Sequence, residues 1–221
     1  MVIDKINMII EIKKPIILLV EGQDEEIFLN YYKKFLRESR RDEWANLDNL
    51  QVICYDGISN LRGTLETIQD ITGSELIRKI GIIRDAEDDA DSAFTKIKTD
   101  LRESGLDVPR EQLISTKGNP KITVMITPEQ GAGSIEIIFL ESVNLDPAFP
   151  CMNQFIECLT PVYERGELEK PKNIHKTKIH TFLASRKEPN ISIGGAAQNG
   201  YWDFNNTAFD RIKAFLNQLV I

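Results

Sequence analysis

The chain has 221 residues, of which 42% are hydrophobic and 28% are charged, a composition typical of a globular protein with one substantial domain. No apolar run approaches the roughly 20 residues that a membrane-spanning helix needs, which excludes a membrane protein, and no secretory pattern precedes the first predicted strand, so we expect a cytoplasmic protein. The formal net charge of −7 means that a phosphate-bearing partner requires a local basic patch or bound cations.

The beginning of the chain predicts one buried strand and one helix. Residues 1–14 alternate loosely between apolar and polar side chains, which indicates an N-terminal arm or an edge strand. Residues 16–20 are an unbroken apolar run rich in β-branched residues, typical of a strand covered on both faces. Asp24 is a suitable cap for a helix whose apolar positions continue to Phe35, and the polar residues 37–49 are expected to form a loop.

The middle of the chain continues this alternation of strands and helices. Further strands are expected at 51–55, 79–84 and 122–126. A helix is expected after each of these strands. The first is capped by Ser59 or Asn60 and runs to about 71, and the second ends near 105. The third follows Gly131-Ala132-Gly133-Ser134. Repeated strand–helix alternation predicts a parallel sheet with right-handed crossovers.

The last third of the chain contains no strong strand. Helices are expected near 149–159, 173–186 and 206–219, and packing is favoured over base stacking for Tyr201, Trp202 and Phe204. The predicted fold class is α/β, with a Rossmann-like central parallel sheet of about four strands, helices on both faces and a helical C-terminal subdomain. The predicted divisions are the arm or edge strand at 1–14, the α/β domain at 15–145 and a helical extension at 146–221 packed on it.

Acidic residues follow two of the predicted strands. Glu21 directly follows the first strand and Asp85 follows the third, and ligands of parallel sheets bind outside the carboxyl ends of the strands. A hard cation such as Mg²⁺ prefers oxygen ligands, and Asp85 and Glu87 are spaced so that both can turn toward one ion. Glu21 is a candidate general acid or base, whose pKa neighbouring carboxylates would raise and a bound cation would lower. These residues predict a divalent-metal site.

Four other acids have two readings each. Asp88, Asp89 and Asp91 are further candidate ligands, but acids in the first turn of a helix also stabilise its positive N-terminal end. Glu136 lies early in a helix after a glycine turn, where a surface or capping role competes with that of a fourth carboxylate in the metal site.

Three motifs in order along the chain carry a resemblance to the Toprim domain, which occurs in topoisomerases, bacterial primases, OLD-type nucleases and small ribosomal-RNA maturases. They are Leu18-Leu19-Val20-Glu21-Gly22 with Asp24, then Gly57, then Ile83-Arg84-Asp85-Ala86-Glu87-Asp88. The resemblance implies a glutamate in acid/base chemistry after the first strand and a DxD motif that holds Mg²⁺ after the third. Glu21 and Asp85 match these positions. Glu87 stands where the motif has its second aspartate, and Asp88 or Asp89 is the alternative ligand.

The C-terminal half extends the resemblance to one family. The chain resembles the small stand-alone Toprim-like family called DUF3226 over most of its length from Pro15 onward. The segments that carry this likeness are Gly133-Ser134-Ile135-Glu136, Lys176-Thr177-Lys178 with Leu183-Ala184-Ser185-Arg186, and Ala196-Ala197-Gln198-Asn199-Gly200-Tyr201-Trp202-Asp203-Phe204.

The leading hypothesis is phosphoryl transfer on DNA or RNA phosphodiesters with Mg²⁺ or Mn²⁺, as in a Toprim-type nuclease. The expected catalytic residues are Glu21 and Asp85, and the expected metal ligands are Glu21, Asp85, Glu87 and Asp88. The residues expected to contact substrate are Gly22, Gly57, Lys176 and Lys178. The two lysines belong to the clearest basic stretch of the chain, for which a solvated helix face is the competing interpretation.

Two other function classes compete with a nuclease. The first is a non-catalytic module that binds a metal, a nucleotide or nucleic acid and works with a partner protein such as a separate ATPase. The second is a receiver-type phosphoacceptor, which requires an acidic pair after the first strand and a lysine after a fifth strand; the sequence indicates neither. A Walker A motif, GxxxxGK[ST], is absent from the sequence.

Overall fold

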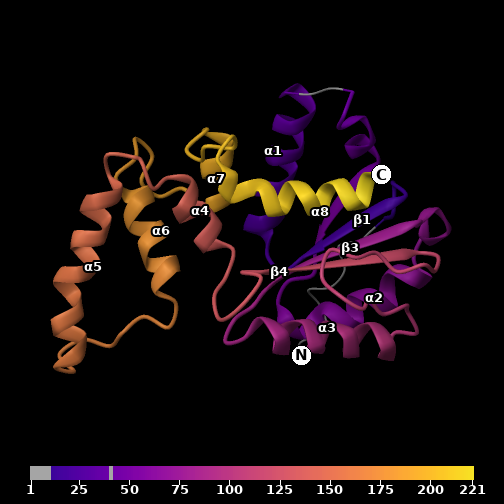
Figure 1. Cartoon of the computed structure of the whole chain (residues 1–221), viewed down its shortest axis with the longest axis horizontal. Helices are drawn as coiled ribbons and strands as arrows, with labels where there is room; N and C mark the ends of the chain where they lie inside the picture. The colour runs from indigo at the N-terminus through magenta and orange to yellow at the C-terminus, as the bar shows by residue number, and fades with distance from the viewer. Residues whose placement is uncertain (1–10, 40–41) are drawn as a thin grey trace.

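A computed structural model describes residues 11–39 and 42–221. The strands in this part of the chain are β1 (Ile16–Val20), β2 (Leu50–Cys54), β3 (Lys79–Asp85) and β4 (Lys121–Thr127). They form one parallel four-stranded sheet in the order β2-β1-β3-β4 (Figure 1). The fold class is α/β, as the alternation of strands and helices predicts.

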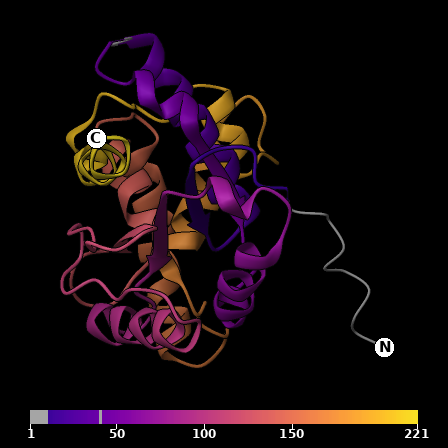
Figure 2. The ribbon, with the colours of Figure 1, turned by 90° about the vertical axis from the view of Figure 1, so that its right-hand side faces the viewer.

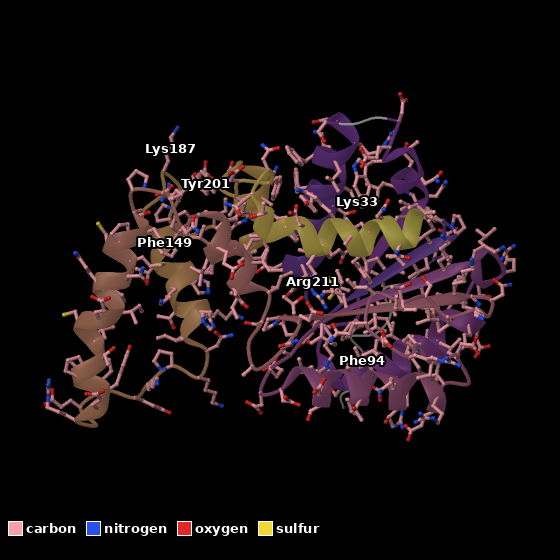
Figure 3. All side chains as sticks on the ribbon, in the orientation of Figure 1. Lys33, Phe94, Phe149, Lys187, Tyr201 and Arg211 are labelled. Atoms are coloured by element: carbon pink, nitrogen blue, oxygen red, sulfur yellow. The ribbon has the colours of Figure 1, made fainter. Side chains whose placement is uncertain are left out.

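Helices cover both faces of the sheet (Figure 1). On one face lie α1 (Gln23–Ser39), α4 (Glu136–Ser142) and α8 (Asp210–Val220), and on the other lie α2 (Leu61–Asp70) and α3 (Ala90–Glu103). Figure 2 shows α3 and α8 nearly end-on, on opposite sides of the sheet, and in Figure 3 Phe94 and Arg211 mark these two sides. Successive strand side chains alternate between the two cores, so Leu18 packs with the first group of helices and Leu19 with the second.

Helix α8 packs closely on the middle of strand β3. A Cβ atom added to Gly81 would lie 2.5 Å from Cδ1 of Leu219 and 3.0 Å from Cζ of Phe215. Real Cβ atoms do not approach other carbon atoms this closely, so the absence of a side chain at Gly81 sets how near α8 comes to the sheet. The end of the chain therefore forms part of the sheet's covering layer.

Two further helices project from the sheet as a pair (Figure 1). They are α5 (Phe149–Glu164) and α6 (Ile174–Ala184), which contact each other, and α6 also contacts α4. The short helix α7 (Ile193–Gln198) packs on α1. The aromatic segment that follows α7 packs in the core as predicted, because Trp202 and Phe204 are buried and the Trp202 indole donates a 3.0 Å hydrogen bond to the carbonyl oxygen of Ile193.

Several boundaries differ from the sequence prediction. The segment 37–49 is not a simple loop, because α1 continues to Ser39 and a 3-10 helix, η1, covers Ala45–Asn49. Neither Ser59 nor Asn60 caps α2 with its side chain; the Asn60 amide instead donates to the carbonyl oxygen of Asp56. The remaining 3-10 helices are η2 (Ile58–Asn60), η3 (Ser74–Leu76) and η4 (Thr207–Phe209).

The helix starts and ends show the same kind of difference. Helix α1 begins at Gln23, so Asp24 lies in its first turn instead of capping it, and α5 runs on to Glu164. Most of the expected N-terminal arm or edge strand, residues 1–10, lies outside the described residues, and residues 11–14 belong to no strand. No helix among the described residues is both long enough and apolar enough to cross a bilayer.

Candidate metal centre

Glu21 and Asp85 lie at the same edge of the sheet. Strands β1 and β3 are neighbours and run parallel, Glu21 directly follows the last residue of β1, and Asp85 is the last residue of β3. Both carboxylates therefore stand at the carboxyl edge, where parallel sheets bind ligands.

The carboxylate of Asp85 is held against the start of α4. Its Oδ1 accepts a 2.9 Å hydrogen bond from the backbone N–H of Ile135. Burial raises the pKa of Asp85 well above its ordinary value of 3.8, and the negative charge of Glu136 raises it further, while the bond from Ile135 opposes the shift. An ionised Asp85 is thus unfavourable unless positive charge arrives nearby.

Glu21 is half-buried and also carries a raised pKa. Burial is the largest cause and the charge of Glu87 is the second, and together they raise the pKa of Glu21 to about 6, while the Arg84 guanidinium lowers it. Its Oε2 atom is buried and has no hydrogen-bond partner among the described residues. A carboxyl with this pKa exchanges protons near neutral pH, as a general acid or base must.

Two more carboxylates belong to the same cluster. Glu136, the first residue of α4, is only 6% exposed, and its Oε2 atom is buried without a hydrogen-bond partner in the described chain. Of the two interpretations of Glu136, its burial excludes a surface role, because α4 turns its first residue inward near Asp85. Glu25, in the first turn of α1, has a pKa raised chiefly by burial and also by the charge of Glu136. The site thus gathers Glu21, Glu25, Asp85 and Glu136, which we call the carboxylate cluster.

The loop after β3 presents its acids differently from Asp85. Glu87 is exposed, has a positive φ of 54°, and pairs with Gly133 through two backbone hydrogen bonds of 2.9 and 2.8 Å. It is the charge that acts most strongly on Glu21. Asp88 is exposed, and no hydrogen bond or ion pair ties its side chain to the cluster. Asp89 caps α3, since its side chain accepts a 2.8 Å hydrogen bond from the backbone N–H of Ser92.

Asp89 is therefore expected to contribute to stability and not to metal binding. Replacing Asp89 with alanine removes the cap of α3 and should lower the free energy of unfolding by about 1 kcal/mol. Urea unfolding followed by circular dichroism measures this loss. Asp89→Asn, which keeps an oxygen acceptor, serves as the matched control and should restore most of the stability. An unchanged unfolding midpoint in Asp89→Ala would contradict the capping role.

The four residues expected to contact substrate do not all lie at the cluster. The Gly57 N–H donates a 3.0 Å hydrogen bond to the carbonyl oxygen of Glu21, and a Cβ atom on Gly22 would lie 2.5 Å from Oε2 of Glu25. The exposed Lys176 is close enough to Glu25 for its charge to lower that residue's pKa. Lys178 instead lines a surface hollow between α4, α5 and α6, so the structure brings only one of the two lysines near the cluster.

The residues of the cluster fit a hard divalent cation by their chemistry. Every member offers only carboxylate oxygens, and the Oε2 atoms of Glu21 and Glu136 are buried with no donor from the described chain. As the side chains now stand, however, no three His, Cys, Asp or Glu residues of the described chain are arranged to hold a metal ion. Ligation therefore requires some of these carboxylates to move closer together.

These features define an α/β protein with a buried carboxylate cluster at the carboxyl edge of its sheet. The chain belongs to the family described as "Protein of unknown function (DUF3226)", whose model matches residues 15–221. This match confirms the family resemblance drawn from the sequence motifs.

Comparison with solved structures finds the C-terminal region of the OLD protein of Xanthomonas campestris pv. campestris, in crystals phased with different heavy atoms. The mercury-phased structure is 13% identical, has a TM-score of 0.37, and the alignment covers 94% of this chain and 85% of that chain. The platinum-phased structure is 12% identical, also with a TM-score of 0.37 and with coverages of 94% and 82%. The comparison with curated proteins gave no match.

Proposed function

We propose that the protein is a metal-dependent enzyme that cleaves nucleic acid phosphodiesters, with Mg²⁺ or Mn²⁺ as its cofactor. The observation that supports this most strongly is the carboxylate cluster itself. Four acids meet at the ligand-binding edge of a parallel sheet, and two of their buried oxygen atoms lack partners in the described chain. Burying such groups costs folding free energy, so we infer that they serve a ligand that neutralises them.

The residues have separate roles in this proposal. Asp85 and Glu136, with Glu25 beside them, would hold the cation, and Glu87 or Asp88 would complete its ligands from the loop after β3. When bound, the cation supplies charge that offsets phosphate repulsion and stabilises the leaving oxygen. Glu21 would then accept the proton of the attacking water as a general base; burial raises its pKa and the bound cation opposes that shift.

Lys176 is the candidate for holding the substrate's backbone. Lys176 is exposed, and its positive charge lies near enough to Glu25 to lower that residue's pKa. A protein with a net charge of −7 repels nucleic acid on average, so a cation at the mouth of the site would favour phosphate there. Gly22 and Gly57 would let the backbone of the two loops approach the substrate closely.

Cleavage is tested with labelled single- and double-stranded DNA and RNA of mixed sequence, incubated with purified protein. We expect cleavage with Mg²⁺ or Mn²⁺ and none in EDTA, and loss of cleavage in Glu21→Gln. Cleavage that persists in EDTA, or that Glu21→Gln leaves unchanged, would contradict the proposal.

The alternative is a non-catalytic module that binds metal and nucleotide or nucleic acid and acts with a partner protein, such as a separate ATPase. The net charge of −7 and the exposed position of Glu87, at the second position of the metal motif, favour this candidate. It predicts metal-dependent binding of nucleic acid without turnover. Cleavage by the purified chain alone excludes it.

The raised pKa of Glu21 predicts how stability depends on pH in the absence of metal. The folded protein holds this proton up to about pH 6, whereas the unfolded chain releases it near 4.5, so stability falls as the pH rises through this interval. Because Glu21 is only half-buried, we discount the contribution to about 1 kcal/mol, or about 2–4 °C in Tm.

Glu21→Gln should therefore unfold at a higher temperature than the wild type at pH 7.5 in EDTA and at a similar temperature at pH 4.5. Differential scanning calorimetry at the two pH values measures this difference. A Glu21→Gln variant that is less stable than the wild type at pH 7.5 would show that burial does not penalise the ionised carboxylate.

A further inference from the structure

One row of side chains crosses the sheet at the level of Glu21, a member of the carboxylate cluster. In the strand register Leu19 of β1 faces Ile53 of β2 and Ile82 of β3. Because side chains alternate between the faces of a strand, the residues two positions further on share one face and one level. These residues are Tyr55, Glu21 and Arg84, in that order across the sheet. Glu21 and Tyr55 directly follow the last residues of β1 and β2, and the 2.9 Å bond from the Tyr55 N–H to the Val20 carbonyl holds the two strand ends together just before this level.

The middle member of this row is Glu21, and its two neighbours are buried polar residues. Arg84 is 6% exposed and Tyr55 is 3% exposed. The Arg84 Nε and Nη1 atoms, the Tyr55 hydroxyl and the Glu21 Oε2 atom are all buried, and none of them has a hydrogen-bond partner among the described residues. Buried polar groups are costly when unpaired, so three of them at one level of one face indicate a shared function.

The charges in the row favour an interaction between Arg84 and Glu21. The positive charge of the Arg84 guanidinium lowers the pKa of both Glu21 and Tyr55. The other charges that act on Glu21, those of Glu87, Glu25 and Glu136, are all negative. The Arg84 guanidinium therefore attracts the Glu21 carboxylate, while the neighbouring carboxylates repel it. Because the guanidinium is buried, we expect it to act through Glu21 and not by direct contact with a substrate phosphate.

We propose that Arg84 is a positioning residue that fixes the Glu21 carboxylate from beneath the site, with the Tyr55 hydroxyl as the second support. This rests on the proposed function of Glu21 as the proton-transferring residue. In this arrangement the guanidinium holds Glu21 toward the attacking water while the other carboxylates stay available to the cation. The proposed role is to orient the Glu21 carboxylate, so both the charge of the guanidinium and its position in the row matter.

The first test does not depend on activity. Thermal unfolding in EDTA is measured for the wild type, Arg84→Met, Glu21→Gln and the double variant. Arg84→Met should lower Tm more when Glu21 is present than in the Glu21→Gln background, by at least about 3 °C. Lys79→Met, which removes a cation at the opposite end of β3, is the control and should combine additively with Glu21→Gln. Additive changes for Arg84→Met would overturn the proposal.

The second test separates positioning from a structural role. In the cleavage assay Arg84→Met should lower kcat about 100-fold and leave KM within about threefold, because substrate does not touch the guanidinium. Arg84→Lys should recover at least about tenfold of that loss, and Tyr55→Phe should lower kcat by a smaller factor. An Arg84→Met variant with unchanged kcat, or one whose loss lies in KM, would overturn the proposal. If the wild type cleaves no nucleic acid, the proposed function fails, while the unfolding cycle still decides whether Arg84 fixes Glu21.

Discussion

Replacing Asp85 with asparagine is expected to lower the rate of Mg²⁺-dependent cleavage by about 1,000-fold or more. Asp85 ends the central strand β3 and points into the carboxylate cluster, so its charge is the best-placed ligand for the cation. Losing several kcal/mol of metal-assisted stabilisation of the transition state corresponds to a rate loss of this size. Single-turnover cleavage of labelled substrate measures it.

The same substitution should stabilise the metal-free protein at pH 7.5. The pKa of Asp85 is raised well above 3.8, so the ionised carboxylate is unfavourable in the folded state, and an amide removes that penalty. The matched control is Asp91→Asn, an exposed acid in the first turn of α3, which should leave cleavage unchanged. Cleavage that survives in Asp85→Asn would remove the main support for the enzyme proposal.

Substitution of Gly81 with alanine is expected to lower the free energy of unfolding by about 1–3 kcal/mol. The new methyl group would meet Cδ1 of Leu219 at 2.5 Å, so α8 must shift or Leu219 must leave its rotamer. For a chain of this size the loss corresponds to about 2–4 °C in Tm for each kcal/mol. Urea and thermal unfolding both measure it.

Two variants isolate the cause of that loss. Leu219→Ala makes room for the new methyl group, so Gly81→Ala should cost less in the Leu219→Ala background than in the wild type. Gly63→Ala lies in α2 where nothing stands within 4 Å of the added atom, and it should stabilise the protein by about 0.5–1 kcal/mol. A Gly81→Ala variant as stable as the wild type would show that the β3–α8 contact is loose.

The sheet and the positions of Glu21 and Asp85 follow from general rules, which is why the sequence predicts them. Apolar runs that alternate with helices specify a parallel sheet, and acids at the ends of neighbouring strands then meet at one edge. The sequence pattern does not reveal the register between β1 and β3. That register places Glu21, one residue beyond the end of β1, level with Arg84, while the Asp85 carboxylate accepts a hydrogen bond from the start of α4.

The burial of Glu136 depends on packing between distant segments, whereas the separation of Lys176 and Lys178 does not. Glu136 is buried because α4 docks its first turn against β3, and no local pattern encodes that contact. The two lysines are a simpler case. Residues two apart on a helix do not share a face, so their spacing alone implies that the two side chains point to different sides of α6.

Helix α7 shows how tertiary contacts override local preference. Two adjacent glycines, Gly194 and Gly195, disfavour a helix, and the sequence pattern therefore predicts none there. Gly194 is needed because the helix backbone lies against α1: a Cβ atom there would be 2.6 Å from Cβ of Ile27, and a Cβ atom on Gly195 would be 2.6 Å from Cγ1 of Ile191. The Ser192 side chain caps α7 by accepting a 3.2 Å hydrogen bond from the N–H of Gly195.

The central claim is that the carboxylate cluster binds a divalent cation, and a metal titration tests it directly. Isothermal titration calorimetry of metal-free protein with MnCl₂ compares the wild type with Asp85→Asn, Glu136→Gln and the control Asp91→Asn. We predict saturable binding by the wild type and the control, and affinity at least about tenfold weaker in each of the two cluster variants. No saturable binding by the wild type, or equal affinity in all four proteins, would contradict it.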